Sequence, residues 1–294
     1  MSFRLTTALA ADLPDEARSV IGAAAGVVSY AVMHRQRRAA RRQLGLLLGQ
    51  RPPEGLVLRE FVSYGRLAVE FLWVQRLAAA AVWSRAEVAG KAHLDAAVAG
   101  GRGVVLALFH QGNWDIAGAV AAAAGYRLLA VAAPVGPPAV DALVVRARAR
   151  MGVETVGPRR AARGVLRAVR QGRPVALLVD LAGESERRLE VEAGGLRVRL
   201  PEARMRLLAR TAAPVLPVTT RRLAPGRFRV VIGPPVRLPP GPGGSDRASD
   251  DAQSARTRAL AEALARALLA AARADPGQWY PFRPVIVGLP RVTM

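Results

Sequence analysis

Residues 103–124 read GVVLALFHQGNWDIAGAVAAAA, and this stretch decides the fold. It opens with a continuous apolar run, Gly103 to Phe109, which is typical of a strand buried on both faces of a parallel sheet. It closes with Ile116 to Ala124, an alanine-rich apolar segment that favours a helix. The short, mostly polar piece between them contains a glycine and so predicts a tight turn. Together these features predict the strand–turn–helix unit of an α/β domain.

The same alternation continues toward the C-terminus. Helical stretches at 140–151 and 159–171 separate several further apolar runs of strand length. Strands that alternate with helices predict βαβ units, and therefore an α/β fold with a largely parallel central sheet flanked by helices. The strand-like runs are at 127–133, 153–156, 174–180, 215–220 and 228–232, and a C-terminal helix with Leu260, Leu264 and Leu268 on one face ends near Asp275.

The first part of the chain has a different character. Apolar residues recur at three- and four-residue steps through 55–88, which predicts helices. We expect residues 12–88 to form a helical appendage of two or three helices. The domain boundary then separates an N-terminal helical membrane-associating segment, 1–88, from the α/β core, 89–294.

Within this appendage, residues 20–33 are apolar, but 14 residues are too few to cross a bilayer, which needs about 20. An apolar helix followed by a basic cluster suits docking on an anionic membrane surface. A core helix followed by an ordinary solvated basic face is the alternative. The basic cluster consists of Arg35, Arg37, Arg38, Arg41 and Arg42.

Composition narrows the chemistry further. The chain has 294 residues, of which 51% are hydrophobic, and it carries 43 basic against 22 acidic side chains, a net charge of +21. Such a charge suits a phosphate-bearing partner: nucleic acid, anionic lipid, or a phosphorylated substrate such as coenzyme A. The absence of cysteine excludes disulfides and cysteine-ligated metals, and no cluster of histidines and carboxylates has metal-ligand spacing. We therefore expect neither a metal nor a prosthetic group.

The candidate chemistry lies in the turn after the first strand. His110 ends that strand, at the edge of the sheet where α/β proteins bind ligands. Asp115 falls in the first turn of the next helix, and Gly112 allows the chain to turn tightly between them. We expect Asp115 to fold back onto one imidazole nitrogen, which leaves the other as a general base. The alternative is a histidine that caps a strand, followed by an ordinary helix N-terminus.

No nucleophile accompanies this pair, because the chain has no cysteine and no G-x-S-x-G turn. A histidine–aspartate pair without a nucleophile suits direct transfer. In that reaction the base takes the proton of an acceptor hydroxyl, and the hydroxyl oxygen attacks an activated acyl carbonyl.

The HQGNWD motif between an apolar strand and an Ala-Gly-rich helix resembles that of the bacterial lipid A late acyltransferases. The resemblance is strongest to their actinobacterial relatives, the phosphatidylinositol mannoside acyltransferases. Other stretches that are similar to the family occur in the same order: LPDEAR at 13–18, SYGR at 63–66 followed by Glu70, GKAHLDAAVAGGRG at 90–103, RARARMG at 146–152 and QGRPVALLVD at 171–180.

The resemblance implies an enzyme at the cytoplasmic face of the plasma membrane, attached peripherally. It would transfer a long acyl chain from acyl-coenzyme A, or from acyl carrier protein, to a sugar hydroxyl of a glycolipid. Acyl-coenzyme A is here a substrate and not a cofactor. The implied acceptor is a phosphatidylinositol mannoside in an anionic membrane, with no nucleic-acid partner.

The resemblance also implies roles for single residues. His110 is the base, Asp115 is its orienting carboxylate, and Glu190, with Glu192 as the alternative, assists the histidine. Asp180, at the end of a strand, is placed among the substrate-binding residues.

Three more side chains are candidates for substrate binding. Asn113 either donates a hydrogen bond near the site or forms the turn. Arg146 and Arg148 are two residues apart on a helix, so they cannot share one face, and one of them is expected to reach a phosphate group. The aromatic segment Trp279 to Phe282 either anchors at a membrane interface or packs the tail onto the core.

Other functions remain open at this level. One is an acyltransferase for another glycolipid or a lysophospholipid. Another, from a different class, is a basic nucleic-acid-binding protein, for which the charge of +21 would be central. An inactive relative is a third, because Leu181-Ala182-Gly183 follows Asp180 where the family usually has D-R-D or D-Q-D.

Overall fold

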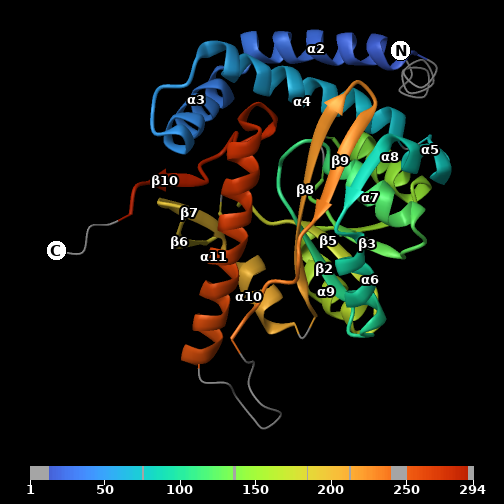
Figure 1. Ribbon diagram of the computed structural model, residues 1–294, viewed down its shortest axis with the longest axis vertical. Helices are drawn as coiled ribbons and strands as arrows, with labels where there is room; N and C mark the ends of the chain where they lie inside the picture. The colour runs from blue at the N-terminus through green and yellow to red at the C-terminus, as the bar shows by residue number, and fades with distance from the viewer. Residues whose placement is uncertain are drawn as a thin grey trace.

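The computed structural model describes residues 13–74, 76–134, 137–183, 185–211, 213–239 and 250–290. In this part of the chain a seven-stranded sheet runs in the order β1-β9-β8-β2-β5-β3-β4 (Figure 1). The strands from β8 to β4 are mutually parallel, while β9 and β1 run against them at one edge. The predicted α/β fold with a largely parallel sheet is confirmed. The strands are β1 (Ala86–Ala89), β2 (Val104–Leu108), β3 (Leu128–Val131), β4 (Val153–Val156), β5 (Pro174–Leu178), β8 (Val215–Ala224) and β9 (Arg227–Ile232).

Strand β2 lies in the middle of this sheet and is buried along its whole length. Alternate side chains enter two separate cores, one on each face of the sheet. Val105 and Ala107 belong to one core, and Leu106 and Leu108 belong to the other. The apolar run at 103–109 is thus explained by burial on both faces.

Helices cover both faces. Helices α6 and α7 pack against the core that contains Leu106, and α9, α10 and α11 pack against the core that contains Val105. Helix α8 lies beside β4. Their bounds are α6 (Lys91–Ala99), α7 (Trp114–Ala123), α8 (Pro138–Arg150), α9 (Ala161–Arg170), α10 (Glu202–Arg210) and α11 (Asp250–Ala274), with short 3-10 turns η1 (Pro158–Arg160) and η2 (Pro276–Gln278).

A small antiparallel sheet in the order β10-β7-β6 lies apart from the main sheet. It comprises β6 (Arg188–Ala193), β7 (Leu196–Pro201) and β10 (Ile286–Gly288). The apolar residues of the hairpin, such as Val191 and Val198, face the core, and charged residues alternate with them. Alternation of apolar and charged residues is a strand pattern, but in this hairpin it is weaker than the continuous apolar runs of the main sheet. The hairpin is therefore absent from the strands predicted from the sequence.

The N-terminal region is helical as expected: α2 (Asp15–Val32), α3 (His34–Leu48), α4 (Glu54–Val74) and α5 (Ala79–Arg85). The described residues of this region form four helices, where two or three were expected. The additional helix is α5, which has only seven residues and is too short to show a period. Strand β1 begins at Ala86 and pairs with β9, so it spans the expected boundary at residue 88. That boundary remains a prediction.

Helix α2 lies along α4 at one end of the molecule (Figure 1). The two helices touch through glycines: a Cβ atom on Gly65 would lie 2.2 Å from the carbonyl oxygen of Gly22. Gly26 meets the backbone of Phe61 and Val62 in the same way. Because small residues fill the contact with α4, the bulky apolar side chains of α2 are left to point elsewhere.

Candidate active site

His110 and Asp180 meet at the carboxyl edge of the main sheet. Strands β2 and β5 are neighbours, and Leu108 pairs with Leu178, so each of the two residues follows its paired leucine by two positions. The Nδ1 atom of His110 lies 2.7 Å from Oδ1 of Asp180. The backbone N–H of His110 donates to Oδ2 of the same carboxylate at 2.9 Å. Both oxygens of a fully buried carboxylate therefore hold one histidine.

This contact fixes the state of the imidazole. A carboxylate accepts hydrogen bonds, so in the neutral ring Nδ1 carries the proton and Nε2 presents a lone pair. Among the described residues, Nε2 has no hydrogen-bond partner, and 23% of the His110 side chain is exposed. Such an arrangement leaves Nε2 available to accept a proton.

Asp115 does not hold His110. Its Oδ1 accepts a hydrogen bond from Nε of Arg148 at 2.9 Å, and the guanidinium of Arg148 lies over the ring of Phe71. The expected contact with Asp115 is wrong because the neighbouring strand β5 supplies a carboxylate at the same sheet edge, while the first turn of α7 directs Asp115 toward α8. The orienting carboxylate is Asp180, which the sequence placed in substrate binding.

The turn that carries His110 depends on Gly112. Its φ is +59°, in the left-handed region. A Cβ atom at this position would lie 2.2 Å from the carbonyl oxygen of Thr220. Since neither the angle nor the space suits another residue, the expected tight turn at Gly112 is confirmed.

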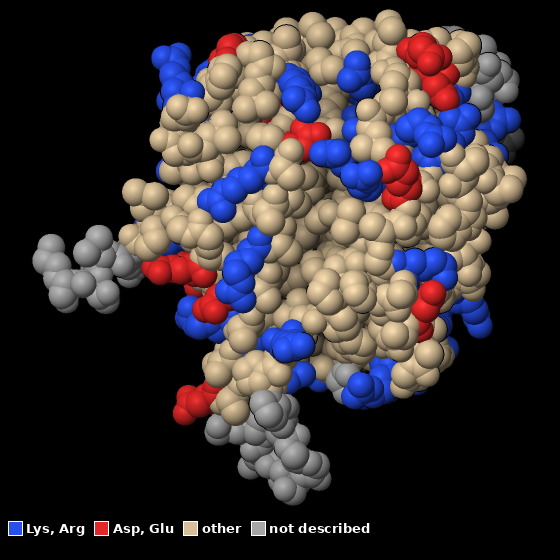
Figure 2. Space-filling view, in the orientation of Figure 1, with Lys and Arg blue, Asp and Glu red and all other residues tan. Residues whose placement is uncertain are grey.

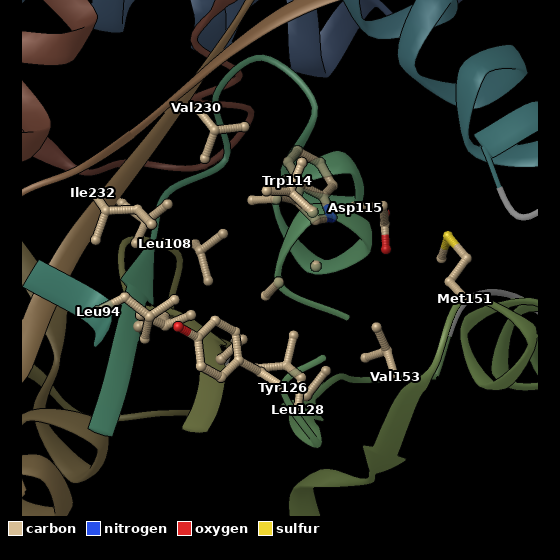
Figure 3. Close-up of a pocket in the computed structure, with 18 of the residues that line it drawn as sticks. Leu94, Leu108, Trp114, Asp115, Tyr126, Leu128, Met151, Val153, Val230 and Ile232 are labelled. Carbon is tan, nitrogen blue, oxygen red and sulfur yellow. The ribbon is translucent and has the colours of Figure 1, made fainter. Parts of the chain in front are cut away.

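An apolar cavity reaches Trp114 and Asp115, close after His110 in the chain, although His110 itself is not among the residues that line it (Figure 3). The space within it that the centre of a water molecule can reach is about 70 Å³. Trp114 and Asp115 lie at one end of the cavity, and the ring of Trp114 contacts that of His110 with centroids 5.1 Å apart. Tyr126 and Leu128 lie at the opposite end.

Besides Trp114, the residues of α7 that line the cavity are Asp115, Ala117, Gly118, Val120 and Ala121. At the far end the hydroxyl of Tyr126 donates to Asp95, and Lys91 pairs with the same carboxylate at 2.7 Å. The walls are apolar and include Leu94, Leu108, Val120, Val153, Val230 and Ile232. A cavity with such apolar walls is suited to an alkyl chain.

Comparison with known proteins now bears on this geometry. Residues 5–284 match the model of the bacterial lipid A biosynthesis acyltransferase family. The chain belongs to this family. It is also 28% identical over 197 residues to a phosphatidylinositol mannoside acyltransferase of Mycobacterium tuberculosis, covering 64% of this chain and 62% of that protein. A phosphatidylinositol mannoside acyltransferase of Mycolicibacterium smegmatis is 28% identical over 211 residues, with 69% and 67% covered.

The match thus spans about three fifths of the length of the Mycobacterium tuberculosis relative. Family membership agrees with the resemblance carried by the HQGNWD motif.

Two more of the predicted site residues have other partners in this family member. Glu190 lies on β6 of the small sheet, where its carboxylate binds Arg197 at 2.7 Å and Arg199 at 3.0 Å. The hydrogen bond from Arg199 is the largest cause that lowers the pKa of Glu190 below its ordinary value. Burial opposes this shift, and the hydrogen bond from Arg197 lowers the pKa further. The structure thus places the Glu190 carboxylate in two ion pairs of the small sheet, and its expected role in assisting His110 stays a prediction.

Asn113 is fully buried and does not face a substrate. Its Oδ1 accepts from the backbone N–H of Ile116 at 3.1 Å and caps α7, while its Nδ2 donates to Glu70 at 3.0 Å. The turn-forming alternative is therefore correct, and the substrate-binding prediction for Asn113 is wrong.

Arg146 and Arg148 point in different directions, as their spacing predicted. Arg148 reaches the cavity and binds Asp115, whereas Arg146 is exposed on the outer side of α8. Arg148 is therefore the one of the two that can meet a bound ligand at the cavity.

The outer face of α2 is unusual for a surface helix. Bulky apolar side chains on it are exposed to solvent, and in Figure 2 few charged side chains line the upper edge, where Figure 1 places α2. Five of the nine large hydrophobic side chains exposed in the described residues belong to this stripe: Val20 (67% exposed), Ile21 (49%), Val27 (47%), Val28 (61%) and Val32 (64%).

The arginine cluster follows on α3. Arg35, Arg38 and Arg42 are exposed. Arg41 instead forms a salt bridge with Glu54, and Arg37 lies over the ring of Tyr30. Among the described residues no helix is both long and apolar enough to cross a bilayer.

Proposed function

We propose that this protein is a membrane-associated acyltransferase that moves a long acyl chain from acyl-coenzyme A to a sugar hydroxyl of a glycolipid. A phosphatidylinositol mannoside is the first candidate acceptor, by likeness to the relatives named above. The observation that carries the proposal is that His110, fixed by Asp180, contacts the ring of Trp114, which lines the apolar cavity.

The chemistry follows from the orientation of the ring. Nε2 of His110 takes the proton of the acceptor hydroxyl as its oxygen attacks the thioester carbonyl carbon. The tetrahedral intermediate then expels the coenzyme A thiolate, and the imidazolium returns the proton to that sulfur. Asp180 keeps Nδ1 protonated and stabilises the imidazolium through its charge. The bond formed is an ester, the bond broken is a thioester, and no covalent acyl-enzyme is required.

The cavity supplies the binding energy for the acyl chain. Burial of each methylene contributes about 0.8 kcal/mol. With the chain in the cavity, the thioester carbonyl lies at the end marked by Trp114, next to His110. Arg148, at the same end, is a candidate for binding a phosphate of the donor or acceptor.

The N-terminal helices provide the attachment to the membrane. The apolar stripe of α2 is suited to insertion among acyl chains, and Arg35, Arg38 and Arg42 are suited to anionic headgroups. We place the protein peripherally on the cytoplasmic face of the plasma membrane, where coenzyme A thioesters occur, and we assign it no nucleic-acid partner.

The test is incubation of the purified protein with radiolabelled long-chain acyl-coenzyme A and a panel of acceptors in anionic vesicles. The panel contains a phosphatidylinositol mannoside, an unrelated glycolipid and a lysophospholipid, and an acyl carrier protein thioester is compared as donor. We expect label in the mannoside. Label only in another acceptor, or only from the carrier protein, would correct that part of the proposal, and no label in any acceptor would refute it.

A further inference from the structure

A buried ion pair lies behind the turn that carries His110. Glu70 of α4 accepts hydrogen bonds from Nε and Nη2 of Arg222 on β8, the latter at 2.7 Å. Both side chains are more than nine-tenths buried. Although burial disfavours the charge of Arg222, the carboxylate of Glu70 raises its pKa above the ordinary value. The same carboxylate accepts from Nδ2 of Asn113 at 3.0 Å, so one end of the pair holds the turn directly.

The other end of the pair reaches the turn through two hydroxyl groups. Nη1 of Arg222 donates to Oγ of Ser63 at 2.8 Å, and Oγ of Ser63 lies 2.9 Å from the hydroxyl of Tyr280. The Tyr280 hydroxyl donates to the carbonyl of Gly112 at 3.0 Å. Because that hydroxyl has a single proton, Ser63 must be the donor to Tyr280. The hydrogen bonds therefore run in one direction, from Arg222 to the backbone of Gly112.

The backbone of the C-terminal segment completes the enclosure. The N–H of Tyr280 donates to the carbonyl of His110 at 2.8 Å, and the N–H of Gly112 donates to the carbonyl of Gln278 at 2.8 Å. The side chain of Gln278 also bonds both backbone groups of Arg222. The turn is thus held by segments that lie far apart in the sequence.

Stability alone does not explain a charged pair at this place. Removal of two charges from water costs several kcal/mol per ion, and apolar residues of equal volume are often at least as stabilising. A network in which every hydrogen bond has a fixed direction does provide one defined geometry for the atoms that it touches.

We propose that Glu70 and Arg222 are positioning residues for His110. Their ion pair, acting through Asn113 on one side and through Ser63 and Tyr280 on the other, fixes the backbone of residues 110–113. That backbone sets the direction in which Nε2 of His110 points. The catalytic consequence rests on the proposed function, whereas the positioning of the ring does not.

Two substitutions each cut one arm of the network with little change in volume. Asn113→Ser keeps an oxygen that caps α7 but removes the amide donor to Glu70. Tyr280→Phe removes the hydroxyl between Ser63 and Gly112. Since a displacement of about 1 Å can cost a factor of about 100 in rate, we expect kcat to fall 10- to 100-fold in each variant. We expect KM for the acyl donor to stay within about twofold, because the cavity is untouched.

Gln43→Met is the matched control. Gln43 is equally buried and bonds the backbone of Val285 and Ile286, but none of its contacts reaches the turn. It should lower the melting temperature as the two variants do, while leaving kcat unchanged.

A second measurement does not depend on turnover. The chain has three histidines, so the imidazole ¹⁵N signals of labelled protein are few. In Asn113→Ser and Tyr280→Phe the His110 signals should shift or broaden, while the signals of His34 and His93 stay as in the unsubstituted protein. In Gln43→Met the signals of all three histidines should stay unchanged.

The proposal is overturned if the His110 signals stay unchanged in both variants, or if kcat falls no further than in Gln43→Met. If the unsubstituted protein acylates no acceptor, the proposed function fails, and the imidazole signals still decide whether the network positions the ring.

Discussion

Asp180 holds His110 by two hydrogen bonds at once, one to Nδ1 of the ring and one to the backbone N–H of the same residue. An aspartate that fixes both the ring and the main chain of a histidine leaves the imidazole one orientation and one tautomer. The reactivity assigned to Nε2 depends on this contact.

Asp180→Asn should therefore lower kcat by up to about 10⁴-fold, the loss that a histidine in the wrong tautomer causes in the serine-protease triad. The amide can donate to Nδ1 and so favours the form in which Nε2 carries the proton. Steady-state kinetics with saturating donor measures the effect. Asp115→Asn is the comparison, and it should cost less because Asp115 contacts Arg148 and not the ring. An equal or greater loss in Asp115→Asn would make Asp115 the orienting carboxylate.

Gly118 allows a direct test of the cavity. A Cβ atom there would lie 3.6 Å from Val153 and 3.8 Å from Leu128, in ordinary contact with the cavity wall. Gly118→Ala should therefore leave activity almost unchanged, whereas Gly118→Leu should fill the passage. We expect Gly118→Leu to reduce kcat/KM for long-chain acyl-coenzyme A at least tenfold and to spare short-chain donors. Equal losses for short and long chains would show that the acyl chain binds elsewhere.

The apolar stripe on α2 predicts a defect in membrane binding. Replacement of Val20 and Val28 by aspartate puts two charges on the face assigned to the bilayer, and binding to anionic vesicles should fall at least tenfold in a sedimentation assay. Leu289→Asp is the control, because Leu289 is 72% exposed but lies far from α2 in the sequence and outside the stripe. The assignment fails if Leu289→Asp weakens vesicle binding as much as the double variant.

Glu60 makes stability depend on pH. It is fully buried in α4, neither carboxylate oxygen has a hydrogen-bond partner among the described residues, and burial raises its pKa well above 4.5. The folded state therefore keeps a proton that the unfolded state loses. The stability is present in full below pH 4.5 and is lost as the pH rises toward the higher pKa of the folded state, by up to about 1.4 kcal/mol per pH unit.

Glu60→Gln has no such proton to lose. Its free energy of unfolding, measured with urea at several pH values, should exceed that of the unsubstituted protein by an amount that grows from pH 5 to pH 7. A constant difference over this range would mean that Glu60 titrates normally in the folded state.

The sequence predicted most of the main sheet because its strands are long apolar runs. The run from Gly103 to Phe109 needs burial on both faces, and only the middle of a parallel sheet offers that. The hairpin of β6 and β7 and the short strands β1 and β10 were missed, since three to six residues of mixed character carry a weak periodic signal.

At the site, the sequence identified His110 and the turn at Gly112, both within one local motif. It assigned the wrong carboxylate because Asp180 meets His110 only when β5 lies next to β2, and strand order is not visible in a local pattern. The end of an apolar strand at Asp180 was a usable signal, since parallel strands present their carboxyl ends at one edge. Glu70 and Tyr280 contact the turn from 43 and 168 positions away, and Arg222 reaches it only through their network, so no local pattern connects these residues.

The most direct test of the central claim is the rate of acyl transfer from long-chain acyl-coenzyme A to a phosphatidylinositol mannoside by the His110→Ala variant. The account predicts a loss of activity of at least 10²-fold, with vesicle binding and melting temperature close to those of the unsubstituted protein. A variant that transfers the acyl group at the normal rate would contradict the assignment of His110 as the base.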